Sequence, residues 1–166
     1  MPSSPPPASG RCSSRKSDQP AALTGCANVE VALTNHPEDK KRLLAALNGF
    51  AQANQLPAVV VRAADLALEE HLTNVMNYAY DDPRPHQIRV RLAVEQGHLL
   101  IEVEDDGKPF NPLQASEVDT SVPLEQKPIG GLGIHLMRRF MDELHYRREG
   151  NRNVLGMRKR LDTPAA

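Results

Sequence analysis

The sequence predicts a two-layer α/β (α+β) sandwich, in which helices cover one face of a mainly antiparallel mixed sheet. Runs of alternating apolar and polar residues, the period of a half-buried strand, occur in hairpin-like pairs. Two longer stretches carry apolar residues at helical spacing between the first strand and the next pair. The chain has 166 residues, enough for one core, and its order of elements is not that of a doubly wound sheet.

Composition and charge exclude several classes of protein. Lys and Arg number 20 against 21 Asp and Glu, and the formal net charge of -1 favours neither a nucleic acid nor a membrane as partner. No run of apolar residues is long enough for a membrane helix, and the first residues lack the apolar core of a signal peptide, so we expect a cytosolic protein. Cys12 and Cys26 support neither a disulfide framework nor a zinc site.

Residues 1–26 are expected to form a disordered tail, and residues 27–162 a single folded domain. Pro and Ser dominate the first 20 residues, where large apolar side chains are almost absent. Such a segment cannot offset its ordering entropy by burial. It is either a passive extension or a docking or regulatory segment.

The N-terminal half of the domain is expected to contain a strand, two helices and a β-hairpin. Alternating apolar residues predict the strands, leucines at helical spacing predict the first helix, and Pro57 opens the second helix. In order, these elements are a strand at residues 28–34, helices at 38–54 and 57–80, and paired strands at 88–94 and 99–103, joined by residues 95–98.

The C-terminal half begins with residues 106–129, which are Pro-rich and have little periodicity. A segment of this length without regular structure is either disordered or a functional lid. A glycine cluster then leads into a helix expected at residues 132–142. Two strand-like runs close the domain at residues 143–148 and 154–160, connected by residues 149–153.

Three acidic and amide residues of the second helix share one face. Glu70, Asn74 and Asn77 stand at i, i+4 and i+7, without a Lys or Arg on that face. Such residues often form only a solvated surface. Here the face offers a carboxylate that could accept a proton and a carboxamide oxygen suited to Mg²⁺. Glu69 is the alternative base if the helix is turned by one residue.

An Asp and a Gly follow the apolar strand at residues 99–103. Asp105 and Gly107 could form an ordinary turn. However, an acid at the end of a buried strand can also accept a hydrogen bond from an exocyclic amine, and a glycine lets a flat ring approach the backbone. We therefore treat Asp105 and Gly107 as candidate residues of a base-binding pocket.

Glycines also precede the helix at residues 132–142. Gly130, Gly131, Leu132 and Gly133 form a flexible entry to that helix, where free backbone N–H groups can bind phosphate. The segment is not a Walker motif, and the motifs of eukaryotic-type kinases are absent. Residues 138 and 139 of the same helix are arginines that either line the phosphate site or lie on the helix surface.

Together these motifs resemble the GHKL ATPase superfamily. Glu70-x-x-x-Asn74 resembles the N box, Asp105-x-Gly107 the first glycine box, and residues 130–133 the second glycine box. The Leu-Thr-Asn-Val run around Asn74, the Phe at 110 and the Gly-Gly-Leu-Gly-Ile-His-Leu-Met run resemble bacterial anti-sigma-factor serine/threonine kinases. The resemblance covers about residues 28–161 and departs from the broad superfamily at Pro109, where many members have a second glycine.

The resemblance implies the Bergerat fold, with ATP between the helical layer and the lid. It implies that Glu70 is the general base, that Asn74 coordinates Mg²⁺, and that Asp105 binds the adenine amine. Gly107 would shape the adenine pocket, and Gly131 and Gly133 would contact phosphate. With Asn77, Gly130 and Leu132, these residues are the expected ATP site.

The activity implied is Mg²⁺-ATP-dependent phosphorylation of a serine or threonine on a small anti-sigma-factor antagonist of the STAS type. The protein would otherwise sequester a sigma factor, and a homodimer is expected from the family alone. A nucleotide-gated binding module, which regulates a partner without phosphotransfer, is the alternative. A base at Glu70 favours the kinase, because a module that only binds ATP needs no proton acceptor.

Overall fold

The fold is described from a computed structural model, which places residues 28–114 and 131–162. The expected tail at residues 1–26 lies outside the described residues. So does most of the expected lid, from residue 115 onward. The part of the lid that is described, residues 106–114, contains one short 3-10 turn, η1 (Pro112–Gln114).

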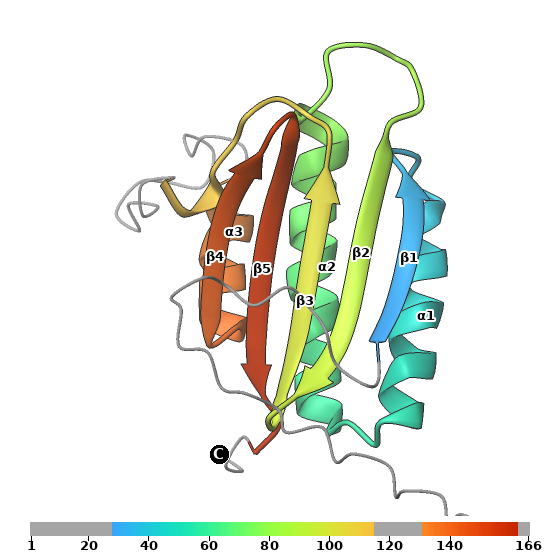
Figure 1. Cartoon of the computed structure of the whole chain (residues 1–166), viewed down its shortest axis with the longest axis vertical. Coiled ribbons are helices and arrows are strands. Elements are labelled where there is room, and N and C mark those ends of the chain that lie inside the picture. Colours follow the sequence, from blue (N-terminus) through green and yellow to red (C-terminus); the bar gives the residue numbers. More distant parts are fainter. Residues whose placement is uncertain (1–27, 115–130, 163–166) are drawn as a thin grey trace, which may run out of the picture.

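Five strands form one sheet in the order β1-β2-β3-β5-β4 (Figure 1). All four neighbouring pairs are antiparallel, which confirms the antiparallel sheet; the mixed pairing included in the expectation is not found among the described strands. Tight hairpins join β2 to β3 and β4 to β5, and such turns produce antiparallel neighbours. The strands are β1 (Asn28–Thr34), β2 (Gln87–Glu95), β3 (His98–Asp105), β4 (Glu143–Glu149) and β5 (Arg152–Arg160).

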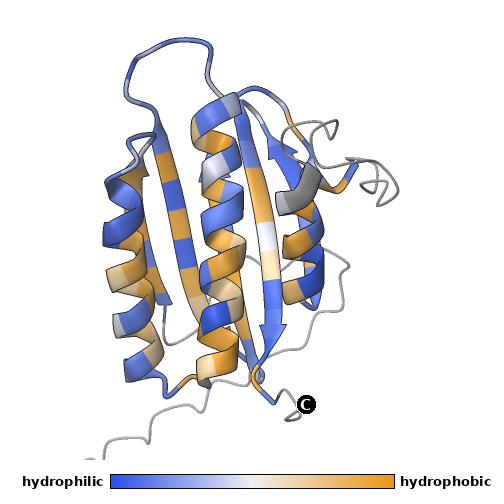
Figure 2. Ribbon diagram, turned by 180° about the vertical axis from the view of Figure 1, so that it is seen from behind, coloured by the Kyte–Doolittle hydropathy of each residue, from blue (hydrophilic) through white to orange (hydrophobic). Residues whose placement is uncertain are grey.

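Three helices of the described residues cover one face of this sheet, and none of them lies on the other face (Figures 1 and 2). They are α1 (Asp39–Ala53), α2 (Ala58–Tyr78) and α3 (Gly131–Phe140). Figure 2 marks hydrophobic residues in orange along the helices and along the strands behind them. The predicted two-layer class is therefore confirmed. No helix of the described residues is long and apolar enough to cross a membrane.

The hairpin between β2 and β3 has longer strands and a tighter turn than expected. The strands continue to Glu95 and His98, so the turn consists of Gln96 and Gly97. Both have positive φ, at 47° and 75°. Positive φ at two successive residues is typical of the two-residue hairpin turn whose twist matches that of the flanking strands. A glycine adopts positive φ without steric cost, which explains its presence at position 97.

The core lies between the helices and the inner face of the sheet. The alternation predicted for the strands is observed, because Val90 pairs with Val103 and Leu92 with Ile101 on the inner face. Leu72 of α2 and Met137 of α3 pack against this face and are fully buried.

The helix expected to continue through Asp142 ends two residues earlier, at Phe140. The backbone N–H of Asp142 donates to the carbonyl of Arg158 at 2.9 Å, and its carboxylate accepts from the N–H of Arg160 at 2.7 Å. A residue whose backbone is paired with a strand cannot continue a helix, so β5 determines the end of α3.

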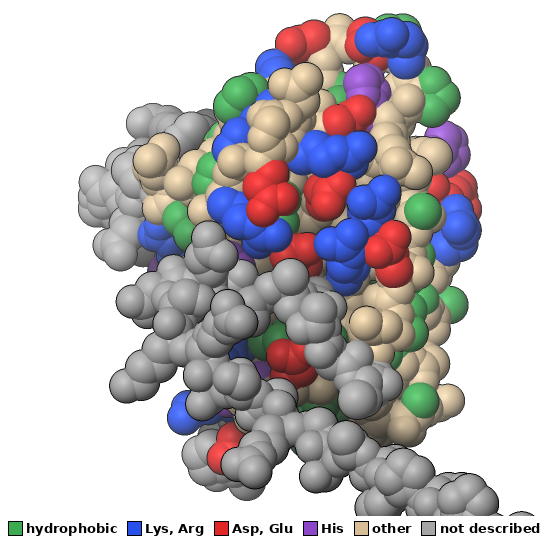
Figure 3. Space-filling model, viewed as in Figure 1, with side chains coloured by type: hydrophobic (Ala, Val, Ile, Leu, Met, Phe, Trp, Pro, Cys, Tyr) green, Lys and Arg blue, Asp and Glu red, His purple; other side chains and the backbone are tan. Residues whose placement is uncertain are grey.

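The face of the sheet opposite the helices carries rows of paired charges, visible in the upper part of Figure 3 as alternating acidic and basic side chains. Glu102 lies between Arg91 and Arg147, with both guanidinium nitrogens 2.9 Å from its oxygens. Glu104 lies between Arg89 and Arg152 in the next row. These carboxylates are buried although they point away from the core, because the long arginine side chains cover them.

Candidate functional site

Two of the predicted motifs meet where α2 packs against the beginning of α3. A Cβ built on Gly133 would lie 2.5 Å from Oε2 of Glu70 and 3.4 Å from Nδ2 of Asn74. Only a glycine leaves room for the carboxylate in its observed position. The N box and the second glycine box are therefore adjacent in space, although about 60 residues separate them in the sequence.

The neighbours of Glu70 and Glu69 distinguish these two candidate bases. Glu69 faces α1, where Nζ of Lys40 lies 2.9 Å from its Oε1. Lys40 also donates to the hydroxyl of Thr73 at 2.6 Å. Glu70 faces α3 and forms no ion pair with any described residue. A carboxylate that is unpaired and half-buried is better suited to accept a proton than one neutralised by a lysine, so the geometry favours Glu70.

Asn77 continues the face of Glu70 and Asn74 to the end of α2, where it is exposed. The structure assigns no hydrogen bond to it within the described residues, and its expected role in ATP binding stays a prediction.

Asp105 is the last residue of β3, and its side chain points inward and is 2 % exposed. Its Oδ1 accepts two hydrogen bonds, from the N–H of Gly107 at 2.9 Å and from Nδ2 of Asn153 at 2.8 Å. Burial raises the pKa of this carboxyl, whereas the two hydrogen bonds and the nearby Arg148 oppose the rise. Among the described residues, no group donates to Oδ2, so this oxygen can accept a hydrogen bond from a ligand.

Gly107 packs against the end of α2. A Cβ at this position would lie 2.5 Å from Cβ of Ala79 and 2.9 Å from the Ala79 carbonyl oxygen. The next residue, Lys108, donates its N–H to that carbonyl at 2.9 Å. The glycine thus brings the turn after β3 against the helix that carries Glu70 and Asn74.

The other expected phosphate-binding residues are only partly described. Gly130 lies outside the described residues, and Gly131 and Leu132 are the first residues of α3. Of the two arginines considered, Arg138 donates to the carbonyl of Leu113 at 2.6 Å and so connects α3 with η1. Arg139 is exposed.

Asn153 is a site residue that the sequence does not predict; it is 5 % exposed and touches both Asp105 and the turn around Gly107. The connection expected between the last two strands, residues 149–153, includes it. In the structure it lies in β5, opposite Asp105 on one side and Arg148 on the other. Only the strand register reveals this position, because no local pattern distinguishes Asn153 from other polar residues of the same hairpin.

The residues between α2 and α3 fit a magnesium ion held together with phosphates. Oδ1 of Asn74, the atom that could ligate a cation, accepts no hydrogen bond from any described residue, and the Glu70 carboxylate lies beside this side chain. Mg²⁺ keeps several waters and takes one or two protein oxygens when substrate phosphates supply the rest. Within residues 28–114 and 131–162, no group of three or more His, Cys, Asp or Glu could hold a metal.

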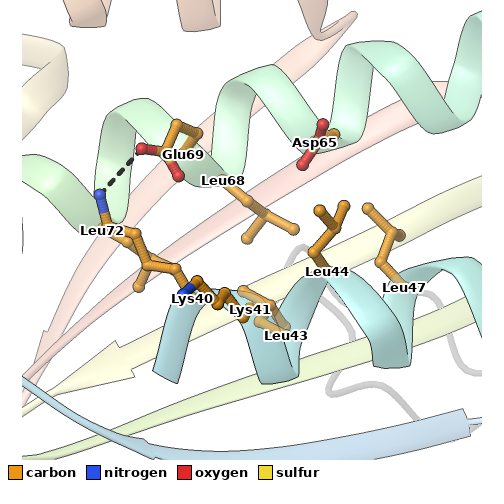
Figure 4. Close-up of a pocket in the computed structure, with 9 residues that line it drawn as sticks. All are labelled: Lys40, Lys41, Leu43, Leu44, Leu47, Asp65, Leu68, Glu69 and Leu72. Atoms are coloured by element: carbon orange, nitrogen blue, oxygen red, sulfur yellow. Dashed lines mark hydrogen bonds and ion pairs between the residues drawn. The ribbon is translucent and has the colours of Figure 1, made fainter. Parts of the chain in front are cut away.

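A separate pocket of about 160 Å³ lies between α1 and α2 (Figure 4). Leucines of both helices line it, and the ion pair of Lys40 with Glu69 lies at one end. Apart from Glu69, the alternative base, none of the predicted site residues that the structure describes lines this pocket, so it is distinct from the site at α2 and α3.

The comparisons with known proteins agree with this geometry. Residues 33–159 match the family described as the histidine kinase-like ATPase domain. The crystal structure of the RsbU and RsbW domains of a Mycobacterium tuberculosis protein has the same fold, with a TM-score of 0.61 at 14 % identity. That match covers 83 % of this chain and 33 % of the other.

Two curated relatives are protein kinases by name. The serine/threonine-protein kinase BtrW of Bordetella bronchiseptica is 30 % identical over 90 residues, which are 54 % of this chain and 63 % of BtrW. The serine-protein kinase RsbW of Bacillus subtilis is 26 % identical over 120 residues, which are 70 % of this chain and 75 % of RsbW. These names confirm the kinase branch to which the three motifs point. With most of its described domain matched, this chain belongs to the family of histidine kinase-like ATPase domains.

Proposed function

We propose that this protein is a Mg²⁺-ATP-dependent kinase that phosphorylates a serine or threonine of a small anti-sigma-factor antagonist. The observation that carries the proposal is the contact of Gly133 with Glu70 and Asn74. It places a candidate base and a candidate metal ligand at the beginning of α3, where backbone N–H groups have no partner within the helix.

Each residue of this contact has a different task in the proposed reaction. The carboxylate of Glu70 accepts the proton of the attacking hydroxyl, since no described cation neutralises it. The side chain of Asn74 would hold Mg²⁺, which would neutralise the charge of the phosphates. Gly133 leaves the space in which the Glu70 carboxylate lies, and the N–H groups of the first turn of α3 bind phosphate.

Asp105 supports ATP as the phosphate donor. Its Oδ2 is available to accept a hydrogen bond from the exocyclic amine of adenine, because the described donors both bond to Oδ1. Gly107 brings the backbone of the turn against α2 beside the Asp105 carboxylate, and in this way it would shape the pocket for the base.

The partners in this proposal are an antagonist of the STAS type, which receives the phosphoryl group, and a sigma factor, which the protein sequesters. Both follow from the resemblance of the motifs to anti-sigma-factor kinases, as does a homodimer. The reaction takes place in the cytosol, where sigma factors act. The formal net charge of -1 supports protein partners rather than direct contact with nucleic acid.

A phosphotransfer assay tests the proposal. The purified protein is incubated with radiolabelled ATP, Mg²⁺ and the STAS-type antagonist encoded beside it, and label on the antagonist is measured. Glu70→Gln keeps the shape of the side chain and removes the proton acceptor, so we expect transfer to fall by roughly 10² to 10⁴ while ATP still binds. Glu69→Gln is the matched control, because Glu69 faces Lys40 and should leave transfer nearly unchanged.

Asn74→Ala should behave differently from Glu70→Gln. Mg²⁺ held by Asn74 would neutralise phosphate charge both when ATP is bound and during transfer, so loss of this side chain should weaken both ATP binding and phosphotransfer. Equal transfer by wild type and Glu70→Gln would remove Glu70 as the base. ATP binding by the wild type without label on any antagonist would instead support the nucleotide-gated module.

A further inference from the structure

We propose that Asn153 is the positioning residue of the base pocket, where it fixes the orientation of Asp105 and holds the Gly107 turn against the sheet. The inference rests on the proposed function, because it assigns Asp105 to recognition of the nucleotide base. It adds a residue from the last strand, far from all three motifs in the sequence.

Asn153 lies in the middle of a cross-strand row on the inner face of the sheet. The register of β3 and β5 places it opposite Asp105, and the register of β4 and β5 places it opposite Arg148. Its amide can therefore reach the side chains of both neighbouring strands. At 5 % exposure it makes these contacts largely without competition from water.

Donors and acceptors occupy opposite sides of this amide. Oδ1 accepts from the hydroxyl of Tyr146 at 2.8 Å, from Nη1 of Arg148 at 2.8 Å and from the N–H of Phe110 at 3.3 Å. On the other side, Nδ2 donates to Oδ1 of Asp105 at 2.8 Å and to the carbonyl of Lys108 at 2.9 Å.

This separation gives the amide one permitted orientation. If it were reversed, its oxygen would face the Asp105 carboxylate and the Lys108 carbonyl, and its NH₂ would face the guanidinium of Arg148. Like groups would then meet on both sides. The observed orientation keeps Asp105 Oδ1 occupied by a donor from the protein and leaves Oδ2 for the ligand.

Asn153 also favours the charged form of Asp105. Burial raises the pKa of this carboxyl, and the hydrogen bond from Asn153 is the largest of the effects that oppose the rise. The other groups that act on it are the N–H of Gly107 and Arg148, which lower the pKa, and Asp106, which raises it. Tyr80, from the segment after α2, also lies within electrostatic range of Asp105. An ionised Asp105 accepts a hydrogen bond from an amine, whereas a protonated one loses part of that capacity.

The test compares the binding of ATP and inosine triphosphate by isothermal titration calorimetry. Inosine triphosphate has a carbonyl oxygen in place of the exocyclic amine, so the ratio of the two affinities measures recognition of the amine. In Asn153→Ala we expect the preference for ATP to fall by about tenfold, the scale of one hydrogen bond to a charged group. The loss of ATP affinity with falling pH should also begin at a higher pH than in the wild type.

Two further variants keep the test decisive. Asn151→Ala, in the exposed turn of the same hairpin, is the control and should leave preference and pH profile unchanged. Tyr146→Phe removes one hydroxyl donor to Asn153 without touching Asp105, and should lower the preference for ATP by a smaller factor. This second variant carries the test if Asn153→Ala does not fold.

The outcomes separate the two proposals. In one outcome the wild type prefers ATP, and Asn153→Ala and Tyr146→Phe fold and show the same preference and pH profile. That result would overturn the role of Asn153 and leave the proposed function intact. A wild type that binds neither nucleotide would overturn the proposed function, and the role of Asn153 with it. A lower preference in both variants and not in Asn151→Ala would support the inference.

Discussion

The carboxylate of Glu70 lies against the backbone of Gly133, so close that a Cβ on the glycine would be 2.5 Å from Oε2. One residue comes from the middle of α2 and the other from the first turn of α3. This contact joins the candidate base to the candidate phosphate-binding helix and makes the position of one dependent on the other.

Gly133→Ala should therefore impair phosphotransfer. The new methyl group would displace the flexible end of Glu70, and a misplaced general base costs at least about tenfold in rate. Label transfer to the antagonist measures the effect. Gly49→Ala is the matched control: Gly49 is in α1 with open space around it, so this change should leave transfer unaltered and stabilise the fold by about 0.5 to 1 kcal/mol. Full activity of Gly133→Ala would show that the position of the Glu70 carboxylate does not matter for phosphotransfer, which would contradict its role as the base.

Asp105→Asn should weaken the stabilisation of the fold by Mg²⁺-ATP. The substitution keeps an oxygen for Asn153 and Gly107 but removes the charge and places an NH₂ group toward the adenine amine. We expect a loss of about 1 to 3 kcal/mol in ATP binding. Thermal unfolding with and without Mg²⁺-ATP measures it, because a ligand that binds only the folded state raises the Tm. A wild type without any such shift would contradict the site as a whole.

His71 should make the fold less stable in acid. Its ring is buried in α2, both ring nitrogens have no hydrogen-bond partner among the described residues, and burial lowers its pKa to about 4. The unfolded chain, with a pKa near 6.5, therefore binds the proton more tightly. This contribution to stability is complete above about pH 6.5 and is lost as the pH falls toward 4, by about 3 kcal/mol in total.

His71→Leu is the variant that tests this dependence, because it keeps an apolar volume and removes the titrating group. Urea unfolding between pH 7 and pH 4 should show a smaller decrease in the free energy of unfolding than in the wild type. Parallel curves for the two proteins would show that the pKa of His71 is the same in the folded and the unfolded chain.

Gly156 and His145 should be energetically coupled. They are paired across β5 and β4, and a Cβ on Gly156 would overlap the imidazole ring of His145. Gly156→Ala should therefore lower the free energy of unfolding by about 1 to 3 kcal/mol, the usual effect of overpacking. In the background of His145→Ala the same change should cost little. A double-mutant cycle measures the coupling, and additive effects would contradict the contact.

Much of this protein follows from its sequence because the relevant patterns are local. The alternation of Val29, Val31 and Leu33 is a property of one strand, and it predicts the inner face of β1 without any partner. The spacing of Glu70 and Asn74 likewise places them on one face of a helix before that helix packs against anything.

Contacts between residues that are distant in the sequence are visible only in the tertiary structure. Glu69 lies beside Lys40 of α1, whereas Glu70 lies beside Gly133 of α3. These two neighbours distinguish the glutamates, and both are distant from them in the sequence. Asn153 joins the base pocket only through the register of β5 with β3, and the same strand ends α3 at Phe140. A helical or strand period specifies which residues share a face. Strand register and helix packing determine which distant residues meet. The period of a single segment contains no information about either.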